Sequence, residues 1–171
     1  MKTEKTLIGT KRFWFLMWGL GLAGQLCWNI ENQWFNTFVY AKIAKDSSIV
    51  TLMVITSALV TTFSTFIFGT LSDRIGSRRR FISIGYIVWG LTTILFGLTE
   101  FVGHGQVGTG AKASIWAAVL VILADDVMIF FGSMGNDSGY NAWSNDMTTD
   151  KNRGQVGAVL AIQPIIGTIV G

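Results

Sequence analysis

The sequence predicts an all-α membrane protein, and three observations support this fold class. Half of the 171 residues are hydrophobic and only 13% are charged, whereas soluble domains carry about 25% charged residues. The charged residues leave uncharged stretches of 18 to 26 residues, close to the roughly 20 apolar residues that a helix needs to cross a bilayer. Apolar side chains run all round these stretches, as expected where lipid is the solvent. The composition argues against intrinsic disorder and against an ordinary soluble enzyme.

The uncharged stretches predict four membrane spans and most of a fifth. The first follows Arg12 with 18 uncharged residues, the second starts at Ser47 with 26, and the third starts at Phe81 with 19. The fourth covers 24 residues from Ala113 and is interrupted only by two adjacent aspartates, and the fifth runs from Gly154 to the end of the chain. The expected spans are about residues 13–41, 48–71, 81–101, 114–146 and 154–171, the last of them truncated.

Basic residues indicate how these spans are oriented. Ten of the 13 Lys and Arg residues lie before span 1 or in the connections between spans 2 and 3 and between spans 4 and 5. Cytoplasmic loops carry an excess of basic residues, so we expect a multi-pass protein of the plasma membrane with its N-terminus in the cytoplasm. The net charge of +3 then reflects membrane topology, which excludes nucleic acid as a partner. The three basic residues on the outer side are Lys42, Lys45 and Lys112.

The sequence contains no arrangement that is typical of an enzyme. It has no recognisable nucleophile–base pair, metal-ligand cluster or phosphate-binding loop, so we expect no catalytic residues, no metal and no cofactor. The single cysteine, Cys27, argues against a disulfide framework or a thiolate metal site. We expect this residue to be an inert, buried thiol.

The connection between spans 2 and 3 is short and strongly basic. From Gly69 to Arg80 it reads Gly-Thr-Leu-Ser-Asp-Arg-Ile-Gly-Ser-Arg-Arg-Arg. Gly76 can adopt a positive φ angle, and arginine side chains can anchor at the membrane interface. These features predict a tight hairpin of two helices.

This connection resembles the signature loop of the major facilitator superfamily, G-x-x-x-D-[RK]-x-G-x-[RK]-[RK], at every defined position. The resemblance implies a twelve-helix transporter in which residues 1–171 form part of the N-terminal six-helix bundle, with the C-terminal half as the missing partner. It also implies that the loop is a conformational latch that docks against a helix end in the other half. An acid near a helix N-terminus gains roughly 0.3–1 kcal/mol, which suits a latch that must open. The latch residues are Gly69, Asp73, Arg74, Gly76, Arg78 and Arg79.

The last 35 residues resemble span 4 and the 4–5 loop of the glycoside–pentoside–hexuronide:cation symporters, the group of melibiose permease. In that group an acid in the membrane precedes an aspartate of the loop by thirteen residues, and Asp137 and Asp150 keep this spacing. The proline that usually follows the first acid is absent, and span 2 lacks the aspartates of the cation-dependent members. The resemblance implies a sugar or glycoside as the solute and a proton or sodium ion as the coupling ion.

Polar side chains within spans 1 and 4 are the candidate binding residues. An ionised acid at the centre of a bilayer costs about 2.5–3.5 kcal/mol on insertion scales, so most such acids must face protein or water. In span 1, four amides recur at helical spacing and predict one polar stripe that can hydrogen-bond hydroxyl groups, while Glu31 points about 120° away from it. The stripe consists of Gln25, Asn29, Asn32 and Asn36.

The same helical spacing predicts a second polar face on span 4. Asp137 is expected at mid-membrane on this face, and Asp125 is expected to point elsewhere. Tyr140 offers a flat, amphipathic ring of the kind that packs against sugars. The residues that share the face are Asp126, Phe130, Ser133, Asp137, Tyr140, Asn141 and Ser144.

These observations together predict a secondary active transporter in which spans 1 and 4 line a central cavity. We expect symport of a small polar solute, a sugar or glycoside, with a proton or sodium ion, by alternating access. Asp137 is the expected coupling residue. Two alternatives remain open: a proton-coupled exporter of drugs or metabolites, and a small membrane scaffold subunit that does not transport.

Overall fold

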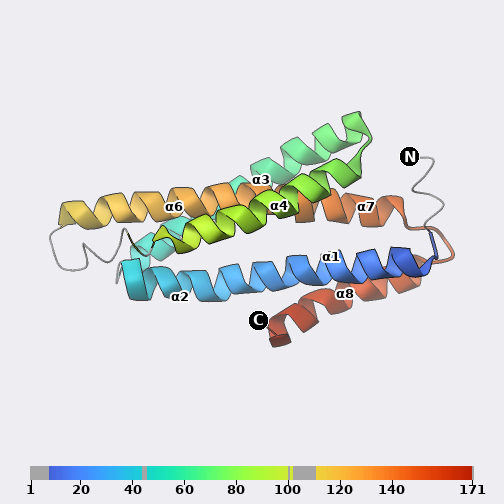
Figure 1. Cartoon of the computed structure of the whole chain (residues 1–171), viewed down its shortest axis with the longest axis horizontal. Helices are drawn as coiled ribbons and strands as arrows, with labels where there is room; N and C mark the ends of the chain where they lie inside the picture. The colour runs from blue at the N-terminus through green and yellow to red at the C-terminus, as the bar shows by residue number, and fades with distance from the viewer. Residues whose placement is uncertain (1–7, 44–45, 100, 102–110, 171) are drawn as a thin grey trace.

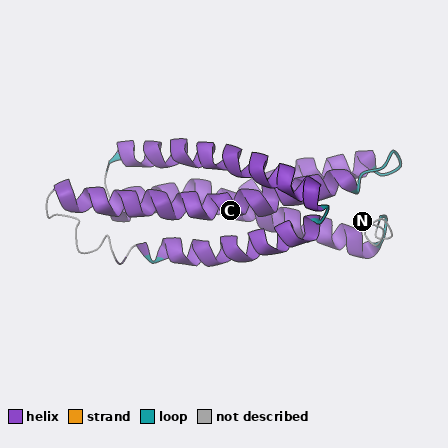
Figure 2. Ribbon diagram, turned by 90° about the horizontal axis from the view of Figure 1, so that it is seen from above, coloured by secondary structure: helices purple, strands orange, loops and turns teal. Residues whose placement is uncertain are grey.

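The computed structural model describes residues 8–43, 46–99, 101 and 111–170. Every regular element in this part of the chain is a helix, which confirms the predicted fold class. The helices run along one common long axis and form a bundle (Figure 1, Figure 2).

The first run of helix contains two π-helical segments. It consists of α1 (Lys11–Ile30), η2 (Glu31–Phe35), α2 (Asn36–Phe38) and η3 (Val39–Ile43). Thr10 caps α1, because its hydroxyl oxygen accepts a 3.2 Å hydrogen bond from a backbone N–H of the first turn. A π-helical turn is wider than an α-helical turn and often occurs at functional sites. The residues after Ile30 therefore do not continue the faces of α1.

A tight turn joins the next two helices, α3 (Ser47–Ile75) and α4 (Arg78–Gly97). Gly76 ends α3 in the left-handed region with a φ of 67°, and its N–H donates to the carbonyl of Ser72 at 2.9 Å. This is the glycine-terminated helix end that a short hairpin requires. The turn brings the end of α3 next to the start of α4, as the sequence predicts.

The fourth long run is also interrupted by a π-helical segment. It consists of α6 (Ala111–Ser133), η4 (Met134–Tyr140) and α7 (Asn141–Asp146), and a short turn leads to α8 (Arg153–Val170). The buried Asn152 closes this turn: its Oδ1 accepts a 2.6 Å hydrogen bond from a backbone N–H, and its amide donates to a carbonyl at 3.1 Å. The turn fixes the direction in which α8 returns along α1.

In the part of the chain that the structure describes, four helices are long and apolar enough to cross a membrane: Ser47–Ile75, Arg78–Gly97, Ile115–Asp146 and Arg153–Val170. The first predicted span, residues 13–41, is helical but is not among them. Its amides and tryptophans lower its mean hydropathy. The run nevertheless lies within the bundle, where α1 packs alongside α8 (Figure 1).

Two apolar clusters fill the two ends of the bundle. Buried polar side chains form a polar layer in the middle of the bundle that overlaps the second cluster, and this layer contains Glu31, Ser64, Asp125 and Asn136. The cluster at the end where α1 begins contains Phe13, Met17, Ile82, Tyr140, Trp143, Met147, Val156 and Val159. The cluster toward the opposite end contains Val39, Ile43, Met53, Trp89, Phe96, Ala117, Val121 and Met128.

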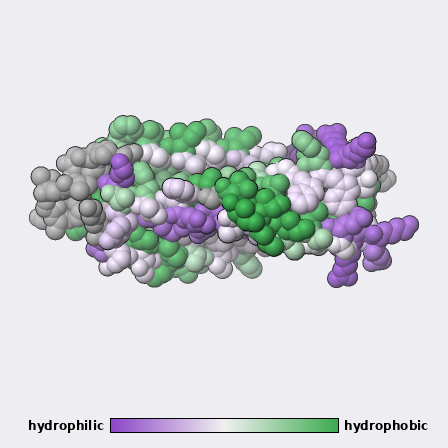
Figure 3. Space-filling view, turned by 90° about the horizontal axis from the view of Figure 1, so that it is seen from below, coloured by the Kyte–Doolittle hydropathy of each residue, from purple (hydrophilic) through white to green (hydrophobic). Residues whose placement is uncertain are grey.

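The outer surface carries many large apolar side chains, as expected for a protein that is surrounded by lipid. Large apolar side chains point outward, with Phe15, Phe66 and Trp116 each more than 70% exposed. Hydrophilic side chains gather at the end where α1 begins, and a smaller hydrophilic patch lies midway along the molecule (Figure 3). The α3–α4 and α7–α8 turns lie at that same end (Figure 1), so these basic connections share one side of the bundle.

Candidate functional site

A polar cavity lies between the first helical run, α3 and α6. Its volume is about 190 Å³, and it opens on one side to the surface. Its walls carry carboxyl, amide and hydroxyl groups together with apolar side chains. The lining residues are Trp28, Glu31, Asn32, Asn36, Met53, Val54, Ser57, Ala58, Thr61, Asp125 and Ile129.

Two buried carboxyl groups face this cavity from different helices. Glu31 of η2 is 6% exposed and Asp125 of α6 is 2% exposed. Asp125 Oδ2 lies 2.6 Å from the hydroxyl oxygen of Ser57 on α3. None of the residues that line the cavity is basic. Two buried acids without a cationic partner are costly, and such groups inside a membrane protein are functional candidates for that reason.

The amide stripe predicted on span 1 divides into two parts. Asn32 and Asn36 line the cavity, whereas Gln25 and Asn29 lie against α8. A Cβ added to Gly167 of α8 would come within 3.0 Å of both Gln25 and Asn29. Gln25 and Asn29 belong to α1, whereas Asn32 lies in the π-helical segment η2 and Asn36 begins α2. The same segment brings Glu31, which we expected on another face, to the cavity beside Asn32.

The two adjacent aspartates of α6 face different pockets, and the structure reverses the roles that helical spacing predicts for them. Asp125 faces the cavity with Glu31. Asp126 is half-buried and lines a separate apolar groove with five other residues. The remaining residues of this groove are Thr56, Leu59, Val60, Phe63 and Phe130.

Asp137 lies on η4, farther along the polar layer. It is half-buried, and its Oδ1 accepts a 3.2 Å hydrogen bond from the amide of Asn136. The Tyr86 hydroxyl from α4 lies 3.1 Å from Asn136 Oδ1 and donates to a backbone carbonyl of α1 at 2.8 Å. Asp137 does not line the cavity, although it lies within electrostatic range of Glu31.

Tyr140 is part of the helix core, in contrast to the prediction that it faces the solute. It is 2% exposed, and its hydroxyl donates to the carbonyl of Met17 at 2.8 Å. Gln163 of α8, 1% exposed, donates to the same carbonyl at 2.9 Å. These contacts join α1, η4 and α8. Asn141, the neighbouring residue in the predicted face, is exposed on the surface of α7.

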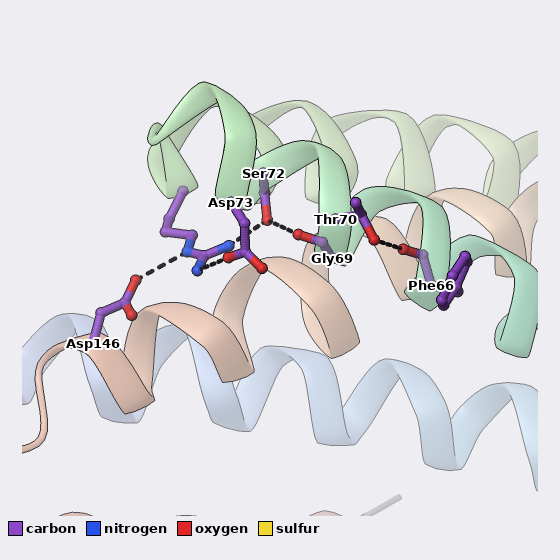
Figure 4. Close-up of polar contacts among 7 residues, drawn as sticks. Phe66, Gly69, Thr70, Ser72, Asp73 and Asp146 are labelled. Carbon is purple, nitrogen blue, oxygen red and sulfur yellow. Dashed lines mark hydrogen bonds and ion pairs between the residues drawn. The ribbon is translucent and has the colours of Figure 1, made fainter.

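The loop between α3 and α4 is held together by Arg78. Its guanidinium contacts Ser72 and Asp73 at the end of α3, and its Nε donates to Asp146 of α7 at 2.9 Å (Figure 4). Arg78 is only 14% exposed, although both acids are largely exposed. Three helix ends are thereby connected through one side chain. Of the other latch residues, Asp73, Arg74, Gly76 and Arg79 lie on the surface, and Gly69 accepts a 3.0 Å hydrogen bond from Ser72.

Sequence reasoning missed four residues of these sites. Asp125, Ser57 and Thr61 line the cavity, and Asp146 joins the loop. A serine and a threonine in an apolar span carry no distinctive signal, because such side chains often bond their own helix backbone. In the sequence, the only signal at Asp146 is that it is an acidic residue close to the basic connection between spans 4 and 5.

Cys27 is exposed, contrary to the expectation of a buried thiol. Among the residues that the structure describes, no group of three or more His, Cys, Asp or Glu side chains is arranged to hold a metal ion.

Comparison with known proteins agrees with the helical bundle and its signature loop. Residues 29–171 match the family model of the Major Facilitator Superfamily. No curated protein and no solved structure matches the chain. The matched region includes every residue that lines the cavity except Trp28, the loop between α3 and α4, and all four candidate membrane helices. The chain therefore belongs to the major facilitator superfamily, a family of membrane transporters whose members are generally not enzymes.

Proposed function

We propose that the protein is a secondary active transporter that moves a small polar solute, a sugar or glycoside, together with a proton or sodium ion. The cavity between the first helical run, α3 and α6 is the observation that supports this most directly. It combines two buried carboxyl groups with the amides of Asn32 and Asn36 and the hydroxyl groups of Ser57 and Thr61.

These groups match the chemistry of a solute with many hydroxyl groups. Each sugar hydroxyl is both a donor and an acceptor, and an asparagine amide offers both functions. Carboxylates add strong acceptors, and hydrogen bonds to a charged group are about twice as strong as neutral ones. The wall of Trp28 supplies an apolar surface for the carbon face of a ring. Asp137, farther along the same polar layer, would extend the site.

The size of the cavity supports a site shared between two bundles. At about 190 Å³ it is smaller than the roughly 300–1,000 Å³ of typical ligand pockets. In a transporter of two bundles the solute site lies at their interface near the middle of the membrane. A second bundle, as the twelve-helix resemblance implies, would supply the other wall. Rocking of the two bundles would then expose the solute to each side in turn.

An uptake assay tests the proposed function. Cells that express the protein are given radiolabelled methyl glucosides and methyl galactosides, with and without an imposed pH or sodium gradient. We expect accumulation that depends on one of these gradients. Accumulation should fall about five- to thirtyfold in Asn32→Leu, because a lost hydrogen bond to solute costs about 1–2 kcal/mol. Gln33→Leu is the matched control, since Gln33 is the next residue but does not line the cavity.

Gradient-dependent efflux of these glycosides without uptake would favour an exporter instead. Equal uptake in cells with and without the protein, for every glycoside tested, would contradict sugar transport. Equal losses in Asn32→Leu and Gln33→Leu would place the solute elsewhere than in this cavity.

A further inference from the structure

The cavity between the first helical run, α3 and α6 carries acidic groups and no basic group. Glu31 and Asp125 line it from two helices and are 6% and 2% exposed. No Lys, Arg or His is among the residues that line it. Among the residues that the structure describes, neither acid forms an ion pair with a basic side chain. A buried negative charge is costly unless a positive charge neutralises it, so the cavity is suited to a cationic solute.

The hydrogen bonds of the two cavity amides make the lining rich in acceptors. The amide of Asn32 donates to the carbonyl of Trp28 at 2.7 Å, and the amide of Asn36 donates to the carbonyl of Asn32 at the same distance. A backbone carbonyl can only accept, so these contacts fix which atom of each amide is the nitrogen. Each amide therefore keeps its carbonyl oxygen and one N–H for a solute. Together with the oxygens of two carboxyl groups, the lining offers more acceptors than donors.

A protonated amine matches this lining better than a neutral group does. An ammonium group brings a positive charge and three N–H donors, whereas a hydroxyl group brings one donor. Its hydrogen bonds to a carboxylate are about twice as strong as neutral ones. One ammonium neutralises one carboxylate, and the second acid can hydrogen-bond to the solute in either protonation state. Trp28 adds an aromatic wall, and aromatic faces attract cations.

We propose that the preferred solute of this cavity is an amino sugar, a monosaccharide that carries a protonated primary amine. This inference rests on the proposed transport function and names its substrate class. The ammonium group binds between Glu31 and Asp125, and ring hydroxyls bind Asn32 and Asn36. Each of these two amides retains an acceptor and a donor, as a hydroxyl group requires. Neutral glycosides bind the same cavity more weakly, because they use only the second set of contacts.

Thermal unfolding of the purified protein in detergent tests this solute class without any transport. A ligand that binds the folded state raises the melting temperature according to its affinity and concentration. Glucosamine, N-acetylglucosamine and methyl glucoside compare a charged amine with a neutral amide and a neutral hydroxyl group on one ring. We expect glucosamine to bind about tenfold more tightly than either neutral sugar, because a hydrogen bond to a charged group exceeds a neutral one by about this factor.

Two further ligands separate an amino sugar from other cations. Cyclohexylamine carries the ammonium group on a ring without hydroxyl groups, and sodium chloride in a potassium buffer supplies an inorganic cation. Both should bind more weakly than glucosamine. Equal affinities for glucosamine and methyl glucoside would overturn the proposal. Tighter binding of cyclohexylamine or of sodium than of glucosamine would also overturn it, because the hydroxyl contacts would then contribute nothing.

Variants that remove charge locate the ammonium group. The double variant Glu31→Gln and Asp125→Asn keeps the shape of both side chains, and we expect it to bind glucosamine and methyl glucoside equally well. Asp126→Asn is the matched control and should retain the wild-type preference, because Asp126 lines the separate groove. A preference that survives in the double variant, or that disappears in Asp126→Asn, would show that the ammonium binds elsewhere. The ligand series on the wild-type protein decides the question if the double variant does not fold.

An uptake assay separates this proposal from the proposed function. Unlabelled glucosamine should inhibit uptake of labelled methyl glucoside at about one tenth of the concentration that unlabelled methyl glucoside requires. Uptake that glucosamine inhibits no better than methyl glucoside does would overturn the amino-sugar assignment and leave the transport function intact. Preferential binding of glucosamine by a protein that moves no sugar would contradict the proposed function and leave the binding site intact.

Discussion

Arg78 illustrates how one side chain can connect elements that are far apart in the sequence. It begins α4, yet it contacts Asp73 at the end of α3 and Asp146 at the end of α7. A guanidinium can do this because it presents five donors in a rigid planar fork. The loop is therefore tied to α7 within this half of the molecule. The docking against the other half that the family resemblance implies remains a prediction.

A double-mutant cycle should detect the contact between Arg78 and Asp146. Arg78→Ala and Asp146→Ala are each expected to lower the stability of the protein in detergent, and the double variant should lose less than the sum. We expect a coupling energy of about 0.2–1 kcal/mol, because Asp146 is largely exposed and water screens the pair. Thermal unfolding at low salt provides the measurement. Asp150→Ala, in the following turn, is the control and should show no coupling with Arg78. A coupling that did not weaken at high salt would contradict an ion pair at the surface.

The π-helical segments explain which parts of the site could be predicted from the sequence. The fold class, the apolar helices and the hairpin at Gly76 follow from composition, length and local turn chemistry. The predicted polar faces of spans 1 and 4 hold only if each residue advances the helix by 100°, as in a regular α-helix. A π-helical turn advances less per residue, so η2 divides the amide stripe and η4 turns Tyr140 into the core. The hydrophobic and polar pattern of the sequence does not mark where these segments occur.

The helices α4 and η4 approach each other closely. Gly85 of α4 and Gly135 of η4 lie with their backbones in contact, and a Cβ on Gly85 would collide with Gly135. Small residues of this kind let helices pack closely in a membrane. The contact places Tyr86, the next residue of α4, against Asn136 at 3.1 Å.

Alanine at Gly85 and alanine at Gly90 of α4 should therefore have opposite effects. Gly85→Ala should destabilise the protein by about 1–3 kcal/mol, the usual cost of overpacking. Gly90→Ala, in the same helix, adds a methyl group where no atom lies within 4 Å. It should be neutral or stabilising by up to about 1 kcal/mol, because alanine favours the helix. Thermal unfolding in one detergent compares the two. Similar losses in both variants would show that helix propensity, not the contact with η4, determines the effect.

At the scale of the whole molecule, the basic turns and the apolar outer surface occupy different parts of the bundle. Apart from one hydrophilic patch, the middle of the bundle is largely apolar outside and polar in one interior layer, and the basic connections lie at one end (Figure 1, Figure 3). An excess of Lys and Arg on one side is the main determinant of membrane orientation. The arrangement of the connections at one end agrees with a single membrane crossing by each long helix. It supports the prediction that this end faces the cytoplasm.

Cysteine labelling tests this orientation directly. In a Cys27→Ser background, single cysteines replace Ser77 in the α3–α4 turn, Asp150 in the α7–α8 turn, and Ser48 at the start of α3. All three native residues are exposed or half-exposed at helix ends. A membrane-impermeant maleimide added to intact cells should label only S48C, whereas inside-out vesicles should label S77C and D150C. The reverse pattern would place the basic end outside, and labelling of S77C and D150C from different sides would contradict the bundle itself, because the two turns lie at the same end.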